Sequence, residues 1–332
     1  MSTIDGSARA TARPGLHRFA IVCVAATFIL VFVGGLVTST GSALAVPDWP
    51  LAFGQLIPEL SGGVRFEWSH RAIAGIVSIL TLILAVWTWK VEARGWVRNI
   101  ALAAFALIVA QAVLGGITVL LLLPLPIAVA HAAVGQAFFC LMVVMALVAD
   151  PNFAGEPTIG RGRERPRLTT LTAATTAIIY VQILLGAVMR HLGAGLAIPD
   201  FPTSFGHLLP PFASVPIAIN FAHRCGAVVV SFFVLWTVVR IVRLHANNAP
   251  LRRSAIALLA LLIVQLTLGA LTIWSGRAVL PTTAHVAIGA VVLAMSLTAT
   301  VRAYAATGLA TVAQPAKVPA PMIKSMEGNI PA

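Results

Sequence analysis

The chain has 332 residues, of which 59% are hydrophobic and only 10% are charged, and its mean hydropathy is +0.96. Soluble domains average about 45–50% apolar and about 25% charged residues, so this composition excludes a water-soluble enzyme, a disordered scaffold and a secreted disulfide module. The formal net charge of +12 does not indicate a nucleic-acid partner, because the basic residues are scattered between apolar runs. We therefore expect an integral membrane protein surrounded by lipid.

Eight apolar stretches are long enough to cross a bilayer, which takes about 20 residues in a helix. They cover residues 17–37, 69–89, 100–121, 127–148, 168–189, 216–239, 255–274 and 282–301. These stretches predict an all-α membrane protein with eight transmembrane helices. The first stretch follows basic residues, as in a signal peptide, but it is too long and lacks a small-residue cleavage site, so we expect a retained helix.

The basic residues predict the orientation of the chain. Seventeen of the 22 Lys and Arg lie near the termini or in the loops that follow every second span. We expect the protein in a bacterial-type cytoplasmic membrane, and the positive-inside rule places both termini on the cytoplasmic side. The segment 304–332 is rich in Ala and Pro and is expected to be a disordered cytoplasmic tail.

The chain contains an internal duplication. Residues 41–55, GSALAVPDWPLAFGQ, align with residues 193–207, GAGLAIPDFPTSFGH, at an offset of 152. At offsets of 153 or 154, His70-Arg71 matches His223-Arg224, Gln111 matches Gln265 and His131 matches His285. Each half has an even number of spans, so the repeat is expected to be parallel, as also occurs in transporters.

The duplication predicts two tandem, pseudo-symmetric four-helix bundles. The expected units are an N-terminal cytoplasmic arm 1–16, an N-terminal bundle 17–150, a basic cytoplasmic linker 151–167, a C-terminal bundle 168–303 and the tail 304–332.

Four histidines fall in the second and fourth span of each half. His70 is expected at the outer start of its helix, and His131, His223 and His285 within the first seven residues of theirs. Two such helices bring a pair of imidazoles to one depth, which suits a heme iron with two axial histidines. Zinc is less favoured because each pair lacks the further ligands of a tetrahedral site, and a hydrogen-bonded structural role is the alternative.

Other residues near these histidines have two interpretations each. Arg71 and Arg224 could contact heme propionates or extend to lipid phosphate. Nearby glycines could admit a macrocycle or serve helix packing; they are Gly75, Gly135, Gly226 and Gly289.

The remaining histidines and the cysteines give weaker signals. His17, His191, His207 and His245 have no histidine counterpart in the other half, and we expect them to be solvated or interfacial. Cys23, Cys140 and Cys225 show no pairing motif, and we expect them to be small buried residues.

One carboxylate breaks the symmetry of the two halves. Glu67 lies three residues before His70, and the second half has Asn220 at the matching position. A carboxylate in one half only could take part in catalysis there, or it could stabilise the start of its helix. Asp48 and Asp200 occur in both halves between prolines, and we expect them to form turns.

Several motifs together resemble one known family. They are Glu-x-x-His-Arg at residues 67–71, TGSALAVPDWPLAFGQ at 40–55, AHAAVGQ at 130–136, and the later segments AHR and AHVAIG. Over roughly residues 17–303, the chain resembles the heme A synthases, membrane oxidoreductases that oxidise a ring methyl of heme O to a formyl group for the terminal oxidases. The resemblance implies a heme b cofactor whose iron binds His223 and His285, a heme O substrate on His70 and His131, and a catalytic role for Glu67.

The resemblance also implies heme O synthase and a membrane electron acceptor as partners. Many bacterial members have a cysteine pair in the first outer loop, but residues 43–53 contain none, so no role of that pair transfers to this chain. A diheme membrane cytochrome that relays electrons, or a heme-handling transporter, is the alternative class. A heme O-forming prenyltransferase is not favoured, because the loops lack aspartate-rich motifs.

Overall fold

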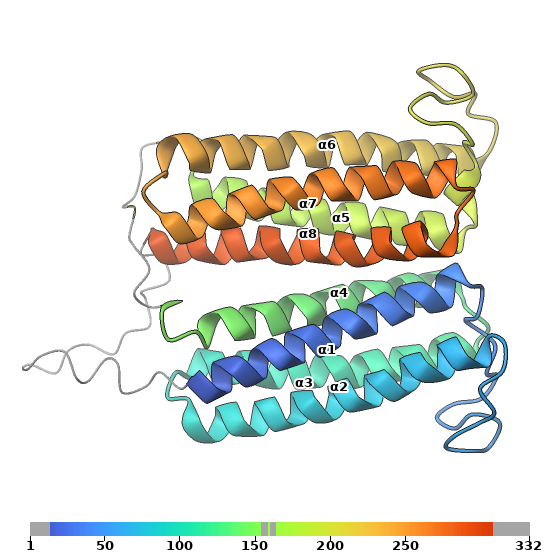
Figure 1. Ribbon diagram of the computed structural model, residues 1–332, viewed down its shortest axis with the longest axis horizontal. Helices are drawn as coiled ribbons and strands as arrows, with labels where there is room; N and C mark the ends of the chain where they lie inside the picture. Colours follow the sequence, from blue (N-terminus) through green and yellow to red (C-terminus); the bar gives the residue numbers. More distant parts are fainter. Residues whose placement is uncertain (1–13, 154–158, 160–163, 308–332) are drawn as a thin grey trace, which may run out of the picture.

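The computed structural model describes residues 14–153, 159 and 164–307, and in these residues the chain is all-helical apart from turns and loops. Eight long helices follow one another in the described chain (Figure 1). They are α1 (Pro14–Ser39), α2 (Val64–Val91), α3 (Gly95–Leu120), α4 (Leu125–Val148), α5 (Leu168–His191), α6 (Val215–Leu244), α7 (Ala249–Trp274) and α8 (Val279–Ala306), with a short 3-10 helix, η3 (Ala194–Leu196), after α5. All eight are long and apolar enough to cross a membrane, which confirms the predicted fold class.

The helices extend beyond several of the apolar stretches from which they were predicted. The difference that bears on the site is at α2, which begins at Val64 although the apolar stretch begins at residue 69. Arg65 and Glu67 interrupt the apolar pattern, but both residues are compatible with a helix, so hydropathy alone places the start too late. Most of the arm 1–16 and of the tail 304–332 lies outside the described residues. Helix α1 begins within the arm, at Pro14, and α8 ends within the tail, at Ala306.

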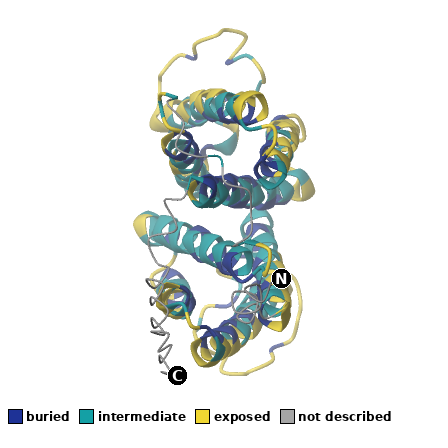
Figure 2. Ribbon diagram, turned by 90° about the vertical axis from the view of Figure 1, so that its left-hand side faces the viewer, coloured by how far each residue is buried: buried dark blue, intermediate teal, exposed yellow. Residues whose placement is uncertain are grey.

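Two four-helix bundles stand side by side (Figures 1 and 2). Helices α1 to α4 pack in a ring in which each contacts its sequence neighbours and α1 closes against α4; α5 to α8 repeat this pattern. Consecutive helices within each bundle run in opposite directions (Figure 1). The bundles meet where α8 packs against α1 and α4, and where α4 packs against α5.

Each bundle has its own apolar core, and a smaller apolar cluster joins them. At the junction, Phe139 of α4 packs with Ala290 and Ala294 of α8. Small residues let helices approach closely in a bilayer, where the lipid gives no hydrophobic drive for helices to associate. Polar contacts cross the same junction: Tyr180 Oη donates to Ala133 O at 3.0 Å.

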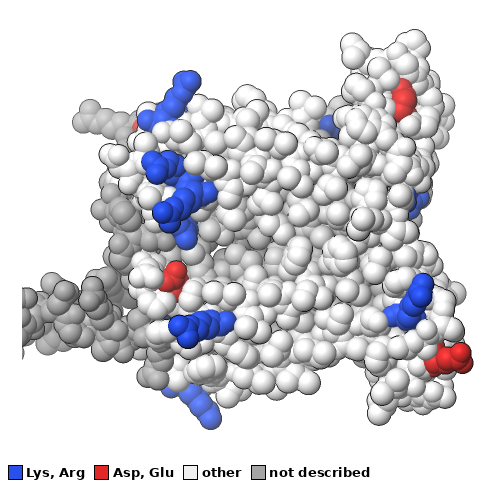
Figure 3. Space-filling view, viewed as in Figure 1, with Lys and Arg blue, Asp and Glu red and all other residues white. Residues whose placement is uncertain are grey.

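In Figure 3, charged side chains lie toward the two ends of the molecule and leave a largely uncharged middle, and many large hydrophobic side chains of the helices are exposed. In the face shown, Lys and Arg gather at the end opposite the long α1–α2 and α5–α6 loops, and a smaller number lie at the loop end. An apolar band between two charged ends is the pattern of a protein that spans a bilayer. The chain is an integral membrane protein.

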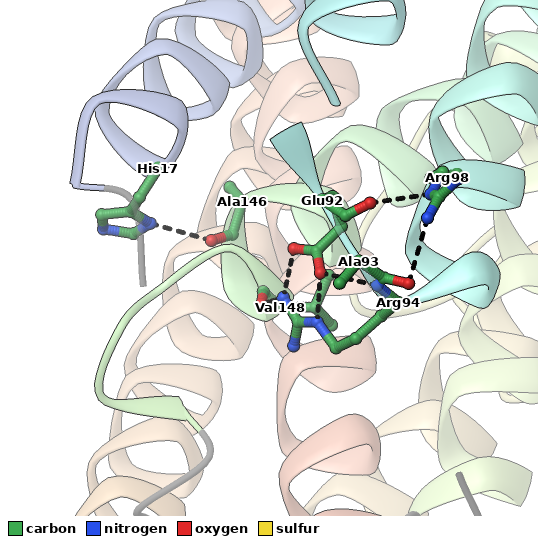
Figure 4. Close-up of polar contacts among 7 residues, drawn as sticks. All are labelled: His17, Glu92, Ala93, Arg94, Arg98, Ala146 and Val148. Atoms are coloured by element: carbon green, nitrogen blue, oxygen red, sulfur yellow. Dashed lines mark hydrogen bonds and ion pairs between the residues drawn. The ribbon is translucent and has the colours of Figure 1, made fainter. Parts of the chain in front are cut away.

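Polar contacts close the N-terminal bundle at the end away from the long loops (Figure 4). Glu92 accepts hydrogen bonds from Arg94 Nε and Nη2 at 2.9 and 2.8 Å, and Arg94 Nη2 also donates to Val148 O at 3.0 Å. Burial alone would raise the pKa of Glu92, but the hydrogen bonds and charge of Arg94 outweigh it and lower that pKa. His17 Nδ1 lies 2.9 Å from Ala146 O, so α1 is tied to α4 at the same end.

Candidate functional site

The four repeated histidines lie at nearly one level of the molecule. His70, His131 and His285 each stand six residues after the first residue of their helix, and His223 stands eight residues after Val215. The expectation for His70 was therefore wrong by more than a helical turn, because α2 starts earlier than its apolar stretch. All four helices begin at the end that carries the long loops, so the histidines share that end.

Each imidazole packs against a glycine of the preceding helix. A Cβ atom added to Gly34 would lie 3.0 Å from His70 Nε2, and one added to Gly186 would lie 3.0 Å from His223 Cε1. Gly115 and Gly269 hold His131 and His285 in the same way, at 3.2 and 3.1 Å.

These four glycines occupy one position in the repeat. Each lies five residues before the last residue of its helix, which is Ser39, Leu120, His191 or Trp274. The repeated Gln-x3-Gly motif already contained Gly115 and Gly269, whereas Gly34 and Gly186 escaped sequence reasoning because their neighbours differ between the halves.

The glycines singled out from the sequence have a different contact. Cβ atoms at Gly135, Gly226 and Gly289 would meet the side chains of Gln111, Gln182 and Gln265, respectively. Gly75 has nothing within 4 Å. Three of the four glycines therefore make room for a glutamine beside the histidines.

The histidine pair of the C-terminal bundle fits the ligands of a single iron. The ring centroids of His223 and His285 are 6.5 Å apart, with an angle of 74° between the ring planes. Imidazole nitrogen binds a transition metal at about 2 Å, so two rings on opposite sides of one iron have centroids roughly 6 Å apart. Both residues are partly buried.

Glutamines orient both imidazoles of this pair. His285 Nδ1 lies 3.1 Å from Gln265 O, and its Nε2 lies 3.4 Å from Gln265 Nε2, so the same glutamine contacts both ring nitrogens. Gln182 Nε2 lies 3.1 Å from His223 Nδ1 and donates to His223 O at 2.8 Å.

The N-terminal pair has fewer ring contacts. Gln111 Nε2 donates to His131 O at 2.9 Å, but the buried His131 Nδ1 has no hydrogen-bond partner in the described chain. The position equivalent to Gln182, at an offset of 152, is Leu30, which cannot hydrogen-bond His70. The two pairs therefore share a backbone frame but differ in how firmly their rings are held.

Glu67 is buried, and both of its carboxylate oxygens have partners. Oε2 accepts from Val46 N at 2.9 Å, and Oε1 accepts from Arg71 Nη2 at 2.6 Å. In the second half, Asn220 Nδ2 donates to Ala194 O at 2.9 Å instead. Helix α2 includes residue 67, so Glu67 lies one turn from His70, on the loop side of that histidine.

Arg71 and Arg224 hold the long loops. Arg71 Nη1 donates to Asp48 O at 2.7 Å and to Leu51 O at 2.9 Å. Arg224 Nη1 donates to Thr203 O at 2.8 Å, and its Nε donates to Asn220 Oδ1 at 3.0 Å. A propionate contact for either arginine stays a prediction, while the loop contacts are a function that sequence reasoning missed.

Asp48 and Asp200 form matching turns, as predicted. Asp48 accepts from the backbone N–H groups of Phe53 and Gly54 at 2.7 and 2.9 Å, and Asp200 accepts from the equivalent pair in its own loop at the same distances. These hydrogen bonds lower the pKa of both aspartates. Phe53 and Gly54 both have positive φ, and the hydrogen bonds to the carboxylate offset the cost of this backbone conformation at Phe53.

Two other singled-out histidines have polar partners of their own, although His191 also lies close enough to His131 to interact with it electrostatically. His191 Nδ1 lies 2.8 Å from Ala187 O on its own helix, and His245 Nε2 lies 3.1 Å from Glu164 Oε1. Of the three free cysteines, only Cys23 is buried, and Cys225 is exposed, which corrects the expectation for that residue. Within the described residues, no three His, Cys, Asp or Glu side chains gather into a metal-binding group, so the histidines occur as pairs.

The fold and the site define a class: an eight-helix membrane protein with two bundles, each carrying two histidines at the molecular end that bears the long loops. A family model described as cytochrome oxidase assembly protein matches residues 17–63 and 64–297. The chain belongs to this family.

Curated relatives of the chain have one name in common. A heme A synthase of Staphylococcus haemolyticus is 31% identical over 262 residues, which cover 75% of this chain and 83% of that protein. A heme A synthase of Symbiobacterium thermophilum is 30% identical over 266 residues, covering 77% and 85%. A heme A synthase of Listeria monocytogenes is 28% identical over 263 residues, covering 77% and 84%.

Proposed function

We propose that the protein is a heme A synthase, an integral membrane oxidoreductase that oxidises a ring methyl of heme O to a formyl group and so yields heme A for terminal oxidases. The observation that carries the proposal is the duplicated pair of imidazoles, each seated on a glycine at one level of its bundle. Family membership and the heme A synthase relatives support it.

We assign different hemes to the two bundles. His223 and His285 would hold a resident heme b, because Gln182 and Gln265 orient their rings before any ligand arrives. A resident heme with two imidazole ligands supplies one-electron transfer at its iron. His70 and His131 would take the substrate heme O, since their less constrained rings suit a ligand that enters and leaves.

The chain's own residues supply binding and proton transfer. The outer loop 40–63 is tied to α2 by Arg71 and Glu67, so it covers the end of the N-terminal bundle beside the histidines. Glu67 would accept a proton released as the methyl group is oxidised. The hydrogen bond from Arg71 orients the carboxylate and places a positive charge beside it.

We infer the surroundings of the enzyme from the charges. The basic end seen in Figure 3 faces the cytoplasm with both termini, and the histidine pairs lie toward the outer leaflet. Heme O synthase would deliver the substrate, and a membrane electron acceptor would receive the electrons.

The test is conversion of heme O by the purified protein. Membranes that contain heme O and the protein should yield heme A, identified by the mass of the extracted pigment, and membranes without the protein should not. A diheme cytochrome that only relays electrons would bind heme and return heme O unchanged, which would refute the proposal.

A further inference from the structure

Two arginines lie together at the loop end of the C-terminal bundle, and the function proposed above gives neither a role. Arg190 stands on α5, four residues after Gly186, which contacts His223. Residues four apart share a helix face, so Arg190 lies one turn nearer the loops on the face that carries this histidine contact. Arg277 follows α7, and its side chain packs over Gly195, with Cδ 3.4 Å from where a Cβ atom of that glycine would be.

Among the residues that the structure describes, no acid forms an ion pair with either arginine. Arg190 and Arg277 lie close enough to interact electrostatically with each other, and Arg190 also interacts with His285. Arg190 uses only Nη2, which donates to Gly35 O at 2.8 Å and to Ser39 Oγ at 2.9 Å. The Arg277 guanidinium has no hydrogen bond or ion pair with any residue that the structure describes.

Such a pair favours a bound anion. Two like charges repel, and the repulsion is stronger at a half-buried position near a membrane surface than in water. An arginine that keeps several N–H donors free can bind a carboxylate or phosphate in a bidentate manner. The observations therefore predict an anion beside the His223–His285 pair.

The N-terminal bundle lacks both charges at the equivalent positions. Thr38 replaces Arg190, four residues after Gly34, and its hydroxyl donates to Gly34 O at 3.0 Å. Leu123 replaces Arg277: Leu123 N donates to Thr118 O and Arg277 N donates to Thr272 O, both at 2.8 Å. The two halves have the same backbone conformation here, with a positive φ of 62° at Leu123 and 67° at Arg277. Only the C-terminal half carries a charge at this position.

We propose that Arg190 and Arg277 form an anion site that binds the propionate carboxylates of the heme held by His223 and His285, and that this site retains the cofactor in the C-terminal bundle. This inference rests on the proposed function, which places a resident heme there. The missing charges at Thr38 and Leu123 then leave the N-terminal site free to release its heme after reaction. A lipid phosphate has related chemistry, and the experiment below separates the two anions.

The experiment measures heme retention in the full-length detergent-purified protein. Arg277→Leu is the main variant, because it introduces the residue of the other half and breaks no hydrogen bond of the described chain. Loss of a charge-assisted contact should speed transfer of heme b from the C-terminal site to excess apomyoglobin by about tenfold. The same variant should lower the midpoint potential of this heme, and Arg277→Lys should restore part of both properties.

An esterified probe identifies the anion. Protein produced without heme is loaded with heme b or with its dimethyl ester, whose propionates carry no charge. The wild type should retain heme b longer than the ester, and Arg277→Leu should remove most of that difference. Leu123→Arg should slow heme loss from the N-terminal site, whereas Arg65→Leu, at an exposed arginine of the same molecular end, should behave as the wild type.

Two results would overturn the inference. If Arg277→Leu keeps wild-type retention and potential, the arginines bind another anion such as lipid phosphate, and the proposed function stands. If the wild type holds no heme between His223 and His285, the resident-heme assignment fails together with this inference.

Discussion

At the scale of single residues, the two halves carry different side chains at equivalent backbone positions, and Glu67 and Asn220 are one such pair. Glu67 and Asn220 both stand one turn before a histidine and both contact the arginine that follows it. The amide also anchors its loop, so anchoring alone does not require a carboxylate. What the carboxylate adds is a negative charge and a site for a proton.

Replacement of Glu67 tests this difference. Glu67→Gln keeps the shape of the side chain but cannot accept a proton at neutral pH, so we expect normal heme content and loss of most heme A formation. The measurement is the ratio of heme A to heme O in extracted membranes, with Asn220→Gln as the matched change in the other half. Near-normal heme A from Glu67→Gln would reduce Glu67 to a loop anchor.

The turn held by Asp48 makes a prediction about pH. The hydrogen bonds from Gly54 and Phe53 lower the pKa of Asp48, so the folded turn binds a proton less readily than the unfolded loop. A lowered pKa stabilises the turn above the pKa of the unfolded residue, and that stabilisation is lost as the pH falls through the folded pKa. We expect hydrogen exchange at the amides of Phe53 and Gly54 to be slow at neutral pH and to lose its protection below about pH 4.

In Asp48→Asn, the protection should be weaker and should no longer change with acidification in this range. Protection that persists unchanged in both proteins at acidic pH would show that the carboxylate does not hold the turn.

At the scale of the helices, hydropathy predicted the number and order of the spans, because twenty apolar residues in a bilayer must be helical. It could not predict their ends. Charged residues such as Arg65 continue α2 outside the apolar layer, so His70 lies deeper in its helix than its apolar stretch suggested. The repeat predicted the four histidines, since equal residues at equal offsets are visible in one sequence.

The contacts between helices were beyond sequence reasoning. Gly34 and Gly186 are ordinary glycines in an apolar helix, and only the packing of α1 on α2 and of α5 on α6 brings them against imidazoles. The loop-holding role of Arg71 and the pairing of Arg190 with Arg277 depend in the same way on which helices become neighbours.

Replacement of these glycines by alanine tests their contacts with the histidine rings. Gly186→Ala would place a Cβ atom 3.0 Å from the His223 ring, so the ring must move, and we expect a changed or partly lost low-spin heme b spectrum. Gly34→Ala should leave that spectrum intact and lower heme A formation. Gly75→Ala, with nothing within 4 Å, is the control and should keep both. Identical spectra for Gly186→Ala and the control would contradict the proposed ligands.

At the scale of the whole molecule, the duplication provides the two separate sites that the proposed function requires. Each bundle has its own core, and the bundles pack together through α1, α4, α5 and α8. Tyr180 crosses the junction to Ala133, two residues from His131, and lies two residues from Gln182, which contacts His223. This hydrogen bond therefore connects the backbone near His131 with the helix that carries Gln182.

The central claim is that the resident heme sits in the C-terminal bundle and the substrate in the N-terminal bundle. Its most direct test is the optical spectrum and heme content of four variants, in which His70, His131, His223 or His285 is replaced by Ala, each purified as the full chain. The account predicts that His223→Ala and His285→Ala lose low-spin heme b, whereas His70→Ala and His131→Ala retain it and fail to form heme A. Equal loss of heme b in all four folded variants would contradict the two-site account and indicate a single shared site.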